Sequence, residues 1–463
     1  MTERAKHLLE FIQKPRHIKI SEKALYTISR LLLLFAVGSF ILTPCIQLLL
    51  LVKSDWKEDW YNLDSNIIIY QTLVKRTNTL AFYAAILCYV YYIVHIIKKR
   101  RTLGNLVGNY GRRMMPVFLM WLLAAAVWIV TMIRGANRYD IRGHSYMDES
   151  IYSYMLYPVC YFFCGCMLWQ SKYKRLLLYL LVFSAVPVNI MALVHEWGPS
   201  MPFFLGTGVS AVFHNSNHYG YYLMLVIVAS LMLFIYEEKL VWRVIDALSA
   251  ILATIVLIPN NTLGAYLAVL VVLISFIIYC AINDHDHIKR AAAALGMFLA
   301  VTFCLSFKYN TILSSVLVMF GDIGLIASDP LGADSAGSSR WRLWKGTVRH
   351  MPESPWLGFG IEGLLDLHGV GTPHNELLQY AAFFGIPVML IYLSAVLLVI
   401  ITVLKRSKAL DKMTLICFCM AVGYFVSSMV GVAIYYTTPF FYIFLGLTYA
   451  EWLHGNDKSC EQK

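Results

Sequence analysis

The sequence contains little charge: Lys, Arg, Asp and Glu make up 14% of its 463 residues, whereas soluble domains average about 25%. Hydrophobic residues make up 59%, and the mean hydropathy is +0.63. A chain this apolar cannot shield most of its side chains from water by folding alone. The composition therefore excludes a soluble enzyme, a disordered chain and a DNA-binding domain, and it predicts an all-α, polytopic membrane protein.

The sequence also lacks the short motifs of cofactor and metal sites. No Cys-x-x-Cys pair occurs among the ten cysteines, and no P-loop, Gly-x-Gly-x-x-Gly or His-Glu-x-x-His segment stands in a fitting context. Asp284 and Asp286 form an Asp-x-Asp pattern, which in nucleotide-sugar enzymes holds a divalent metal, but they lie in a short polar turn. We interpret them as solvated loop residues and expect no cofactor and no metal.

Long apolar runs account for most of the chain. A membrane helix needs about 20 mostly apolar residues, and the longest run, 377–404, is expected to tilt or project outward. No linker or repeat divides the chain, so we expect one membrane domain, residues 1–463. The twelve predicted spans are 31–52, 78–97, 114–133, 151–170, 176–194, 219–236, 244–259, 263–282, 291–307, 377–404, 413–432 and 437–452.

Basic residues gather between alternate apolar runs. The formal net charge of +11 could indicate a nucleic-acid partner, but most of the 38 Lys and Arg residues fall in short segments on one side, such as the run Lys98–Arg101. The positive-inside rule places these segments and both termini in the cytoplasm. We therefore expect a lipid bilayer and no nucleic acid as the partner of this surface.

The longest segment on the outer side covers residues 308–376. Loops beyond about 12–15 residues are uncommon unless they are functional or disordered. This one contains Trp341, Trp344, Trp356 and several glycines, which is typical of a compact folded cap rather than a disordered loop. We infer that the function resides on this outer face.

A basic amphipathic helix is predicted within this loop. It would be capped by Ser338 or Ser339 and end before Pro352. Its basic face would be formed, at i, i+3 and i+7 spacing, by Arg342, Lys345 and Arg349. Such a helix could simply anchor the loop in the membrane interface. Arg340 stands at the helix start, and its planar guanidinium suits bidentate contact with phosphate.

A second polar segment immediately precedes the tenth predicted span. Thr372 and Pro373 suit the N-cap and N1 positions of a helix, which would place His374 and Asn375 in its first turn. The positive end of the helix dipole favours a bound anion and disfavours imidazolium, so His374 is expected to be neutral and could act as a base. The alternative is a capping histidine at the membrane boundary.

These segments resemble the O-antigen ligase and polymerase family of membrane glycosyltransferases. In that family a late, large outer loop carries an Arg followed four residues later by Trp, then Pro-x-x-Gly-x-Gly, then His-Asn at the start of a span. The corresponding residues occur here in the same order, as Arg340 and Trp344, residues 355–360, and His374 with Asn375. The strong part of the resemblance covers residues 338–388.

Two further matches and one small departure accompany this pattern. The family's spacing from the histidine to a glycine is met by Gly385, whereas Val388 stands where Gly, Thr or Tyr is usual. The segment Phe213–Asn217 is similar to the family's Phe-x-Asn-Pro-Asn, with Asn217 matching the final Asn.

One departure is larger. The family often carries a second essential Arg in a Ser-Arg-Gly segment before a span, and the corresponding residues here are Thr262–Gly264. The candidates to replace the missing Arg are Arg342 and Arg349.

The resemblance implies a GT-C-like fold and transfer of a glycan from a polyprenyl-pyrophosphate carrier to an acceptor hydroxyl, on a glycan or lipid, at the outer face of the cytoplasmic (inner) membrane. In this scheme Arg340 stabilises the leaving pyrophosphate, His374 is the general base, and no metal is required. The implied substrate-binding residues are Asn375, Arg342, Arg349, Trp344 and Asn217.

Several alternatives remain at this level. The same chemistry serves a polysaccharide polymerase, which is slightly favoured, or a ligase, and the two differ only in the acceptor. A transporter or lipid flippase would place charges within its spans, whereas these spans contain few. An inactive scaffold of the same fold would explain the missing second Arg.

Overall fold

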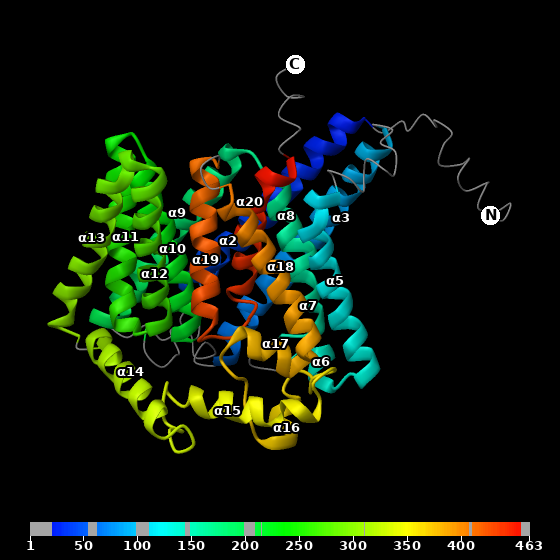
Figure 1. Ribbon diagram of the computed structural model, residues 1–463. Coiled ribbons are helices and arrows are strands. Elements are labelled where there is room, and N and C mark those ends of the chain that lie inside the picture. Colours follow the sequence, from blue (N-terminus) through cyan, green and yellow to red (C-terminus); the bar gives the residue numbers. More distant parts are fainter. Residues whose placement is uncertain are drawn as a thin grey trace.

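The computed structural model describes residues 21–53, 63–98, 111–143, 149–198, 209–213, 215–309, 311–406 and 410–454, and every regular element in these ranges is helical. The beginning of α2 and the end of α20 lie at the upper end of a helix bundle, and α14, α15 and α16 lie across its lower end (Figure 1). His214 and most of the basic run 98–101 fall outside the described residues.

Nine helices in the described part of the chain are long and apolar enough to cross a membrane. This confirms the prediction of an all-α, multi-pass membrane protein. They are α2 (Glu22–Lys53), α3 (Leu63–Lys98), α5 (Gly111–Arg134), α9 (Ser171–Trp197), α10 (Ser216–Tyr236), α11 (Leu240–Asn260), α12 (Leu263–Asn283), α13 (Ile288–Ser306) and α18 (Ile386–Leu404).

Three more of the twelve predicted spans are helical over a shorter length, at the lower end of the roughly 17–25 residues that cross a membrane. The fourth consists of α7 (Ile151–Leu156), a π-helical turn η3 (Tyr157–Phe162) and α8 (Phe163–Met167). Pro158 lies at the start of η3, where its missing N–H removes an ordinary helical hydrogen bond and favours the wider turn. The other two are α19 (Lys412–Ser428) and α20 (Thr438–His454).

The expected single long span over 377–404 is wrong, because the chain breaks at Gly385. The break separates α17 (Glu376–Phe384), which precedes the membrane span, from α18. Gly385 has a φ of 88°, which favours glycine, and Pro387 lies in the first turn of α18. These two residues end one helix and begin the next in a new direction.

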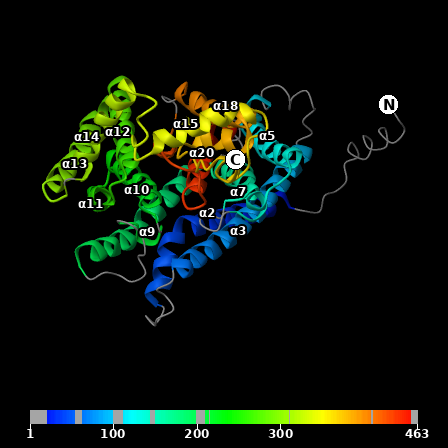
Figure 2. The same ribbon diagram turned by 90° about the horizontal axis from the view of Figure 1, so that it is seen from below.

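The loop after α13 forms a folded cap, as predicted, and we use this name for residues 311–375. It contains α14 (Thr311–Ser328), α15 (Arg340–His350), the short turn η6 (Met351–Glu353) and α16 (Gly363–His368). The apolar helix α14 was not predicted, and it leaves Leu317 and Phe320 exposed. Seen from below, α15 lies between the group of α12, α13 and α14 and the group of α5 and α18 (Figure 2).

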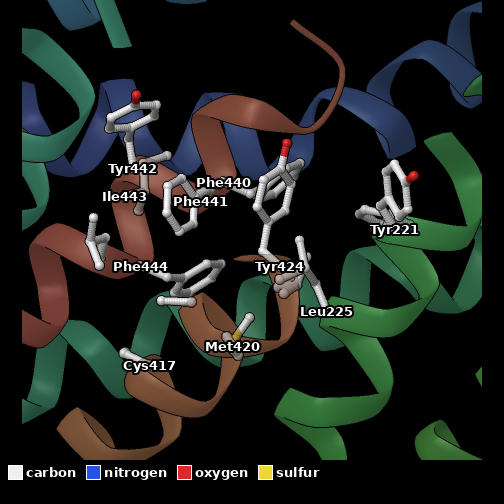
Figure 3. Packing of buried hydrophobic residues seen from close by; sticks show 14 of the residues in the cluster. Tyr221, Leu225, Cys417, Met420, Tyr424, Phe440, Phe441, Tyr442, Ile443 and Phe444 are labelled. Carbon is white, nitrogen blue, oxygen red and sulfur yellow. The ribbon is translucent and has the colours of Figure 1, made fainter. Parts of the chain in front are cut away.

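Helix α10 forms the centre of the bundle, since nearly all of its residues are buried. Its Tyr221 and Leu225 face α19, where Tyr424 stacks on Phe441 of α20 with ring centroids 5.0 Å apart (Figure 3). Lipid is as apolar as these side chains, so close van der Waals and ring packing hold the helices together. This aromatic core fixes α10, and with it Tyr221, next to the cap.

Candidate functional site at the cap

Arg340 is the first residue of α15, as predicted, but neither preceding serine caps the helix with its side chain. Ser338 and Ser339 have φ values of 56° and 68°, and this left-handed backbone leaves the N-cap Ser339 without a side-chain hydrogen bond. Arg340 donates from Nη1 to the carbonyl oxygen of Gly337 at 3.2 Å. Its Nε is buried without a hydrogen-bond partner, so the guanidinium retains an unused donor.

A cavity of about 510 Å³ lies beside Arg340, between α10, α12, α14 and α15. Polar groups on its wall include Asn217, Asn261 and Thr262, and Asp322 accepts a hydrogen bond from the Gly337 backbone N–H at 2.8 Å. The remaining wall is largely apolar and includes Leu263, Leu267, Val318, Met319, Ile323 and Ile326. A pocket of this size and mixed chemistry suits an amphipathic ligand.

Arg340 is the one cationic side chain among the described residues that line this cavity. Leu263, at the position of the family's second Arg, contributes an apolar wall instead. Arg342 and Arg349 are exposed on α15 and do not line the cavity. The structure therefore brings neither candidate to the place of the missing charge.

His374 lies just before α17 rather than within its first turn, which corrects the expected position of the helix start. The N-cap is Asn375, and His374 has a left-handed φ of 49°. Thr372 does not cap the helix, because its hydroxyl donates to Oε1 of Glu362 at 3.1 Å. The polar Asn375 side chain competes successfully for the cap position, since it accepts from the Leu378 N–H at 3.0 Å.

The environment of His374 favours the neutral imidazole. Burial, followed by the nearby positive charge of Arg340, lowers the pKa of His374 to about 4. The guanidinium of Arg340 thus acts electrostatically on the imidazole, although His374 is not among the cavity-lining residues. Trp344 connects the two regions, because it lines the cavity and donates from Nε1 to the carbonyl oxygen of Pro373 at 2.7 Å.

The other two predicted binding residues differ in whether their side chains are free to contact a ligand. Asn217 lines the cavity. Asn375 uses both ends of its amide in the fold, because Oδ1 caps α17 and Nδ2 donates to the carbonyl oxygen of Met429 at 2.9 Å. Its observed contacts therefore position the segment that carries His374.

The Pro355–Gly360 segment packs its backbone directly against the break between α17 and α18. The N–H groups of Phe359 and Gly360 donate to the last carbonyls of α17, and the first N–H of α18 donates to Pro355 O at 2.8 Å. A Cβ on Gly358 would lie 2.6 Å from backbone atoms of residues 383–385, and one on Gly385 would lie 2.4 Å from Trp356 O. The two glycines thus permit a contact that orients α17.

A buried polar clamp beside this segment was not predicted. Arg134 donates to Asp140 at 2.6 Å and to the carbonyl oxygen of Phe383 at 2.8 Å, and Asp140 accepts from the Ile361 N–H at 3.0 Å. Asn137 caps α6 (Arg138–Arg142) in a capping box with Asp140. The Asn-x-x-Asp spacing is the sequence signal that could have indicated this structure.

Glu376 is a second residue near the site that the sequence analysis did not predict. It begins α17 directly after His374 and Asn375, and it is fully buried. Burial raises its pKa to about 7, while the nearby hydroxyls of Ser428 and Tyr392 lower it. Neither carboxylate oxygen makes a hydrogen bond of normal geometry. This places a second titratable group with a shifted pKa two residues from the imidazole.

Comparison with known proteins agrees with the resemblance stated above. Residues 225–393, from the middle of α10 to the middle of α18, match the model of a family described as O-antigen ligase. The matched part contains Arg340, Trp344, His374 and Gly385, and it confirms the resemblance for this part of the chain. No curated protein matches the chain. The family supports a role in membrane glycan transfer during polysaccharide assembly.

Proposed function

From the O-antigen ligase match over residues 225–393, we propose that this protein transfers a glycan from a polyprenyl-pyrophosphate carrier to an acceptor hydroxyl. The observation that carries the proposal is Arg340 on an amphipathic cavity, with an unused buried donor and with a charge that helps to keep the His374 imidazole neutral. The protein would lie in the inner membrane. The cap end of the bundle would face away from the cytoplasm, and both termini would lie in the cytoplasm.

The cavity chemistry fits such a donor. Its polar wall and Arg340 would receive the pyrophosphate, and the apolar side chains of α12 and α14 would contact the first part of the prenyl chain. The exposed apolar surface of α14, which includes Leu317 and Phe320, would lie in the lipid. Asn217 would contribute a side-chain amide to the polar wall.

The transfer step is a displacement at the anomeric carbon. The acceptor oxygen forms a bond to this carbon, the carbon–oxygen bond to the pyrophosphate breaks, and His374 takes the acceptor's proton. Arg340 stabilises the negative charge that grows on the leaving pyrophosphate. Because Arg340 also lowers the pKa of His374, binding of the anionic donor offsets that charge and strengthens the base only when the donor is present.

The proposal is tested with purified protein in liposomes and a defined lipid-linked donor and acceptor. His374→Ala and Arg340→Ala should abolish product at equal protein levels, whereas Arg138→Ala should not, because Arg138 is exposed on α6 and away from the cavity. Product unchanged from the wild-type level in both the His374→Ala and Arg340→Ala proteins would refute the proposal. Absence of product from the wild-type protein itself would favour an inactive scaffold. Donor movement without bond exchange would indicate a flippase.

The acceptor is identified by the glycans of cells that lack the protein. Single repeats that remain on the carrier lipid would indicate a polymerase. Full-length chains that remain on the carrier would indicate a ligase.

A further inference from the structure

Two histidines and one carboxylate converge at the far end of α15 from Arg340. Glu353 Oε1 lies 2.7 Å from Nδ1 of His350, and Glu353 Oε2 lies 3.0 Å from Nε2 of His368. One possible ligand atom from each of the three residues lies within 4.8 Å of the others. No residue of this group lines the cavity or contacts the Arg340 and His374 pair through any described hydrogen bond.

The three side chains come from separate pieces of the cap. His350 ends α15, Glu353 ends η6, and His368 ends α16. The two imidazole rings stack with their centroids 3.9 Å apart, and each places one nitrogen within hydrogen-bond distance of a Glu353 oxygen. All three side chains are partly exposed, so an ion could reach them from the surrounding water.

The protonation states suit a cation. A glutamate carboxylate is ionised near neutral pH, so Glu353 can offer a negatively charged oxygen to a cation. A neutral imidazole can present a lone pair at the nitrogen that faces Glu353 and keep its proton on the other nitrogen. Two imidazole nitrogens and one carboxylate oxygen form a ligand set typical of Zn²⁺ with an open fourth position.

We propose that His350, Glu353 and His368 form a binding site for a divalent transition-metal ion of the Zn²⁺ type. Zn–N and Zn–O bonds are about 2.0–2.2 Å long, so small ring movements would let the ion replace the two hydrogen bonds to Glu353. The site lies apart from the transfer chemistry, and its existence does not depend on the proposed function.

A bound ion would fasten two helices of the cap. α15 begins with Arg340, and the chain after α16 leads directly to His374. Close packing already joins these pieces, since a Cβ on Gly346 would lie only 3.0 Å from the side chain of Val370. The ion would therefore cross-link the two segments of the cap that carry the transfer residues.

The test is a calorimetric titration of chelator-treated, full-length protein in detergent with ZnCl₂, without donor or acceptor. His368→Gln and Glu353→Gln each remove one ligand at similar size, and both should raise the Kd at least about tenfold. The matched control is His285→Gln, because His285 lies exposed in the turn η5 (His285–His287) at the other end of the bundle. Zinc should also raise the Tm of the wild type and His285→Gln proteins, and not that of His368→Gln.

Equal stoichiometry and Kd in the wild type and His368→Gln proteins would overturn the proposal, as would a wild type that binds no equivalent of zinc. If His368→Gln does not purify as folded protein, the same comparison rests on Glu353→Gln. Co²⁺ in place of Zn²⁺ adds a check on the ligands, because a thiolate-to-cobalt charge-transfer band would assign the ion to cysteines and refute the site.

Discussion

The indole of Trp344 donates a hydrogen bond to the carbonyl oxygen of Pro373, 2.7 Å away, and so fixes the peptide that leads into His374. This contact joins the Arg-x-x-x-Trp and His-Asn segments across the cap. It gives Trp344 a positioning role in addition to its place on the cavity wall. The left-handed backbone at His374 depends on such support, because a non-glycine residue in this conformation is strained.

Trp344→Phe should therefore lower kcat about 10- to 100-fold with a smaller change in the donor KM. The variant keeps an aromatic ring on the cavity but leaves the buried Pro373 carbonyl without its donor, at a cost of about 1–3 kcal/mol. The matched control is Trp341→Phe, because Trp341 also lines the cavity but donates to Pro330 O, away from His374. Equal losses in the two variants would argue that only ring packing matters.

Arg340→Lys should retain little activity. A lysine ammonium carries the same charge, but it cannot reproduce the planar fork that contacts two phosphate oxygens. We expect kcat/KM to fall at least about 100-fold, a loss of about 3 kcal/mol in transition-state stabilisation. Initial rates with the lipid-linked donor measure this loss. Near-wild-type rates for the lysine variant would mean that Arg340 supplies only positive charge to the cavity.

Transfer activity should decline only at unusually low pH on the acid side of its pH profile. His374 must be neutral to accept a proton, and its pKa of about 4 is below the ordinary value of 6.5. Activity expressed as kcat/KM should therefore stay level as the pH falls from 8 to 5 and decline only below that range. The limb for kcat should lie at higher pH, because the bound donor offsets the charge of Arg340 and raises the pKa of His374. A limb near pH 6.5 in kcat/KM would mean that burial and Arg340 do not lower the pKa of the base.

Much of the fold was predictable, because hydrophobic length is a strong signal and lipid leaves the backbone few alternatives to the helix. The failures occurred where local sequence did not determine the outcome. Apolar composition continued through Gly385, so the break before α18 depended on a tertiary contact with the Pro355–Gly360 segment. Helix α14 is apolar and short, and its sequence resembles both a span and a loop.

Candidate site residues could be predicted from the sequence where the side chain has one characteristic chemical role, as for an arginine that binds phosphate or a histidine that accepts a proton. The resemblance predicts that Arg340 and His374 act together, and in the structure the charge of Arg340 is one of the two causes that lower the pKa of His374. From the sequence, the helix dipole was expected to keep the imidazole neutral, whereas in the structure burial and then the charge of Arg340 lower its pKa. Glu376 was missed because an acidic residue at the start of a helix is ordinary, and only the packing around it makes it unusual.

Glu376→Gln should stabilise the protein at alkaline pH. The folded-state pKa of about 7 exceeds the ordinary 4.5, so the folded protein binds more protons than the unfolded chain between these values. Wild-type stability should therefore fall as the pH rises from about 4.5 to 7, by about 1–3 kcal/mol in all. The Gln variant lacks this titration, so its Tm should match the wild type at pH 4.5 and exceed it at pH 8.

Thermal unfolding in detergent at both pH values measures this difference. Asp322→Asn is a suitable comparison, since Asp322 is also a carboxylate in the cap but is only partly buried. A Gln variant that is less stable than the wild type at pH 8 would mean that the Glu376 carboxylate is ionised and paired in the folded protein.

Gly385→Ala should disrupt the orientation of α17 and, with it, the position of His374. The added Cβ would lie 2.4 Å from Trp356 O, and the φ of 88° is strained for alanine. Strain of this kind costs on the order of 1–3 kcal/mol before the clash is counted. We expect a clear fall in Tm and loss of transfer activity.

Gly296→Ala in α13 is the matched control, because a Cβ there meets no atom within 4 Å. It should leave both quantities near wild type, since alanine also favours the helix. A Gly385→Ala protein with wild-type Tm and activity would show that the close packing of the Pro355–Gly360 segment on the helix break does not position the histidine.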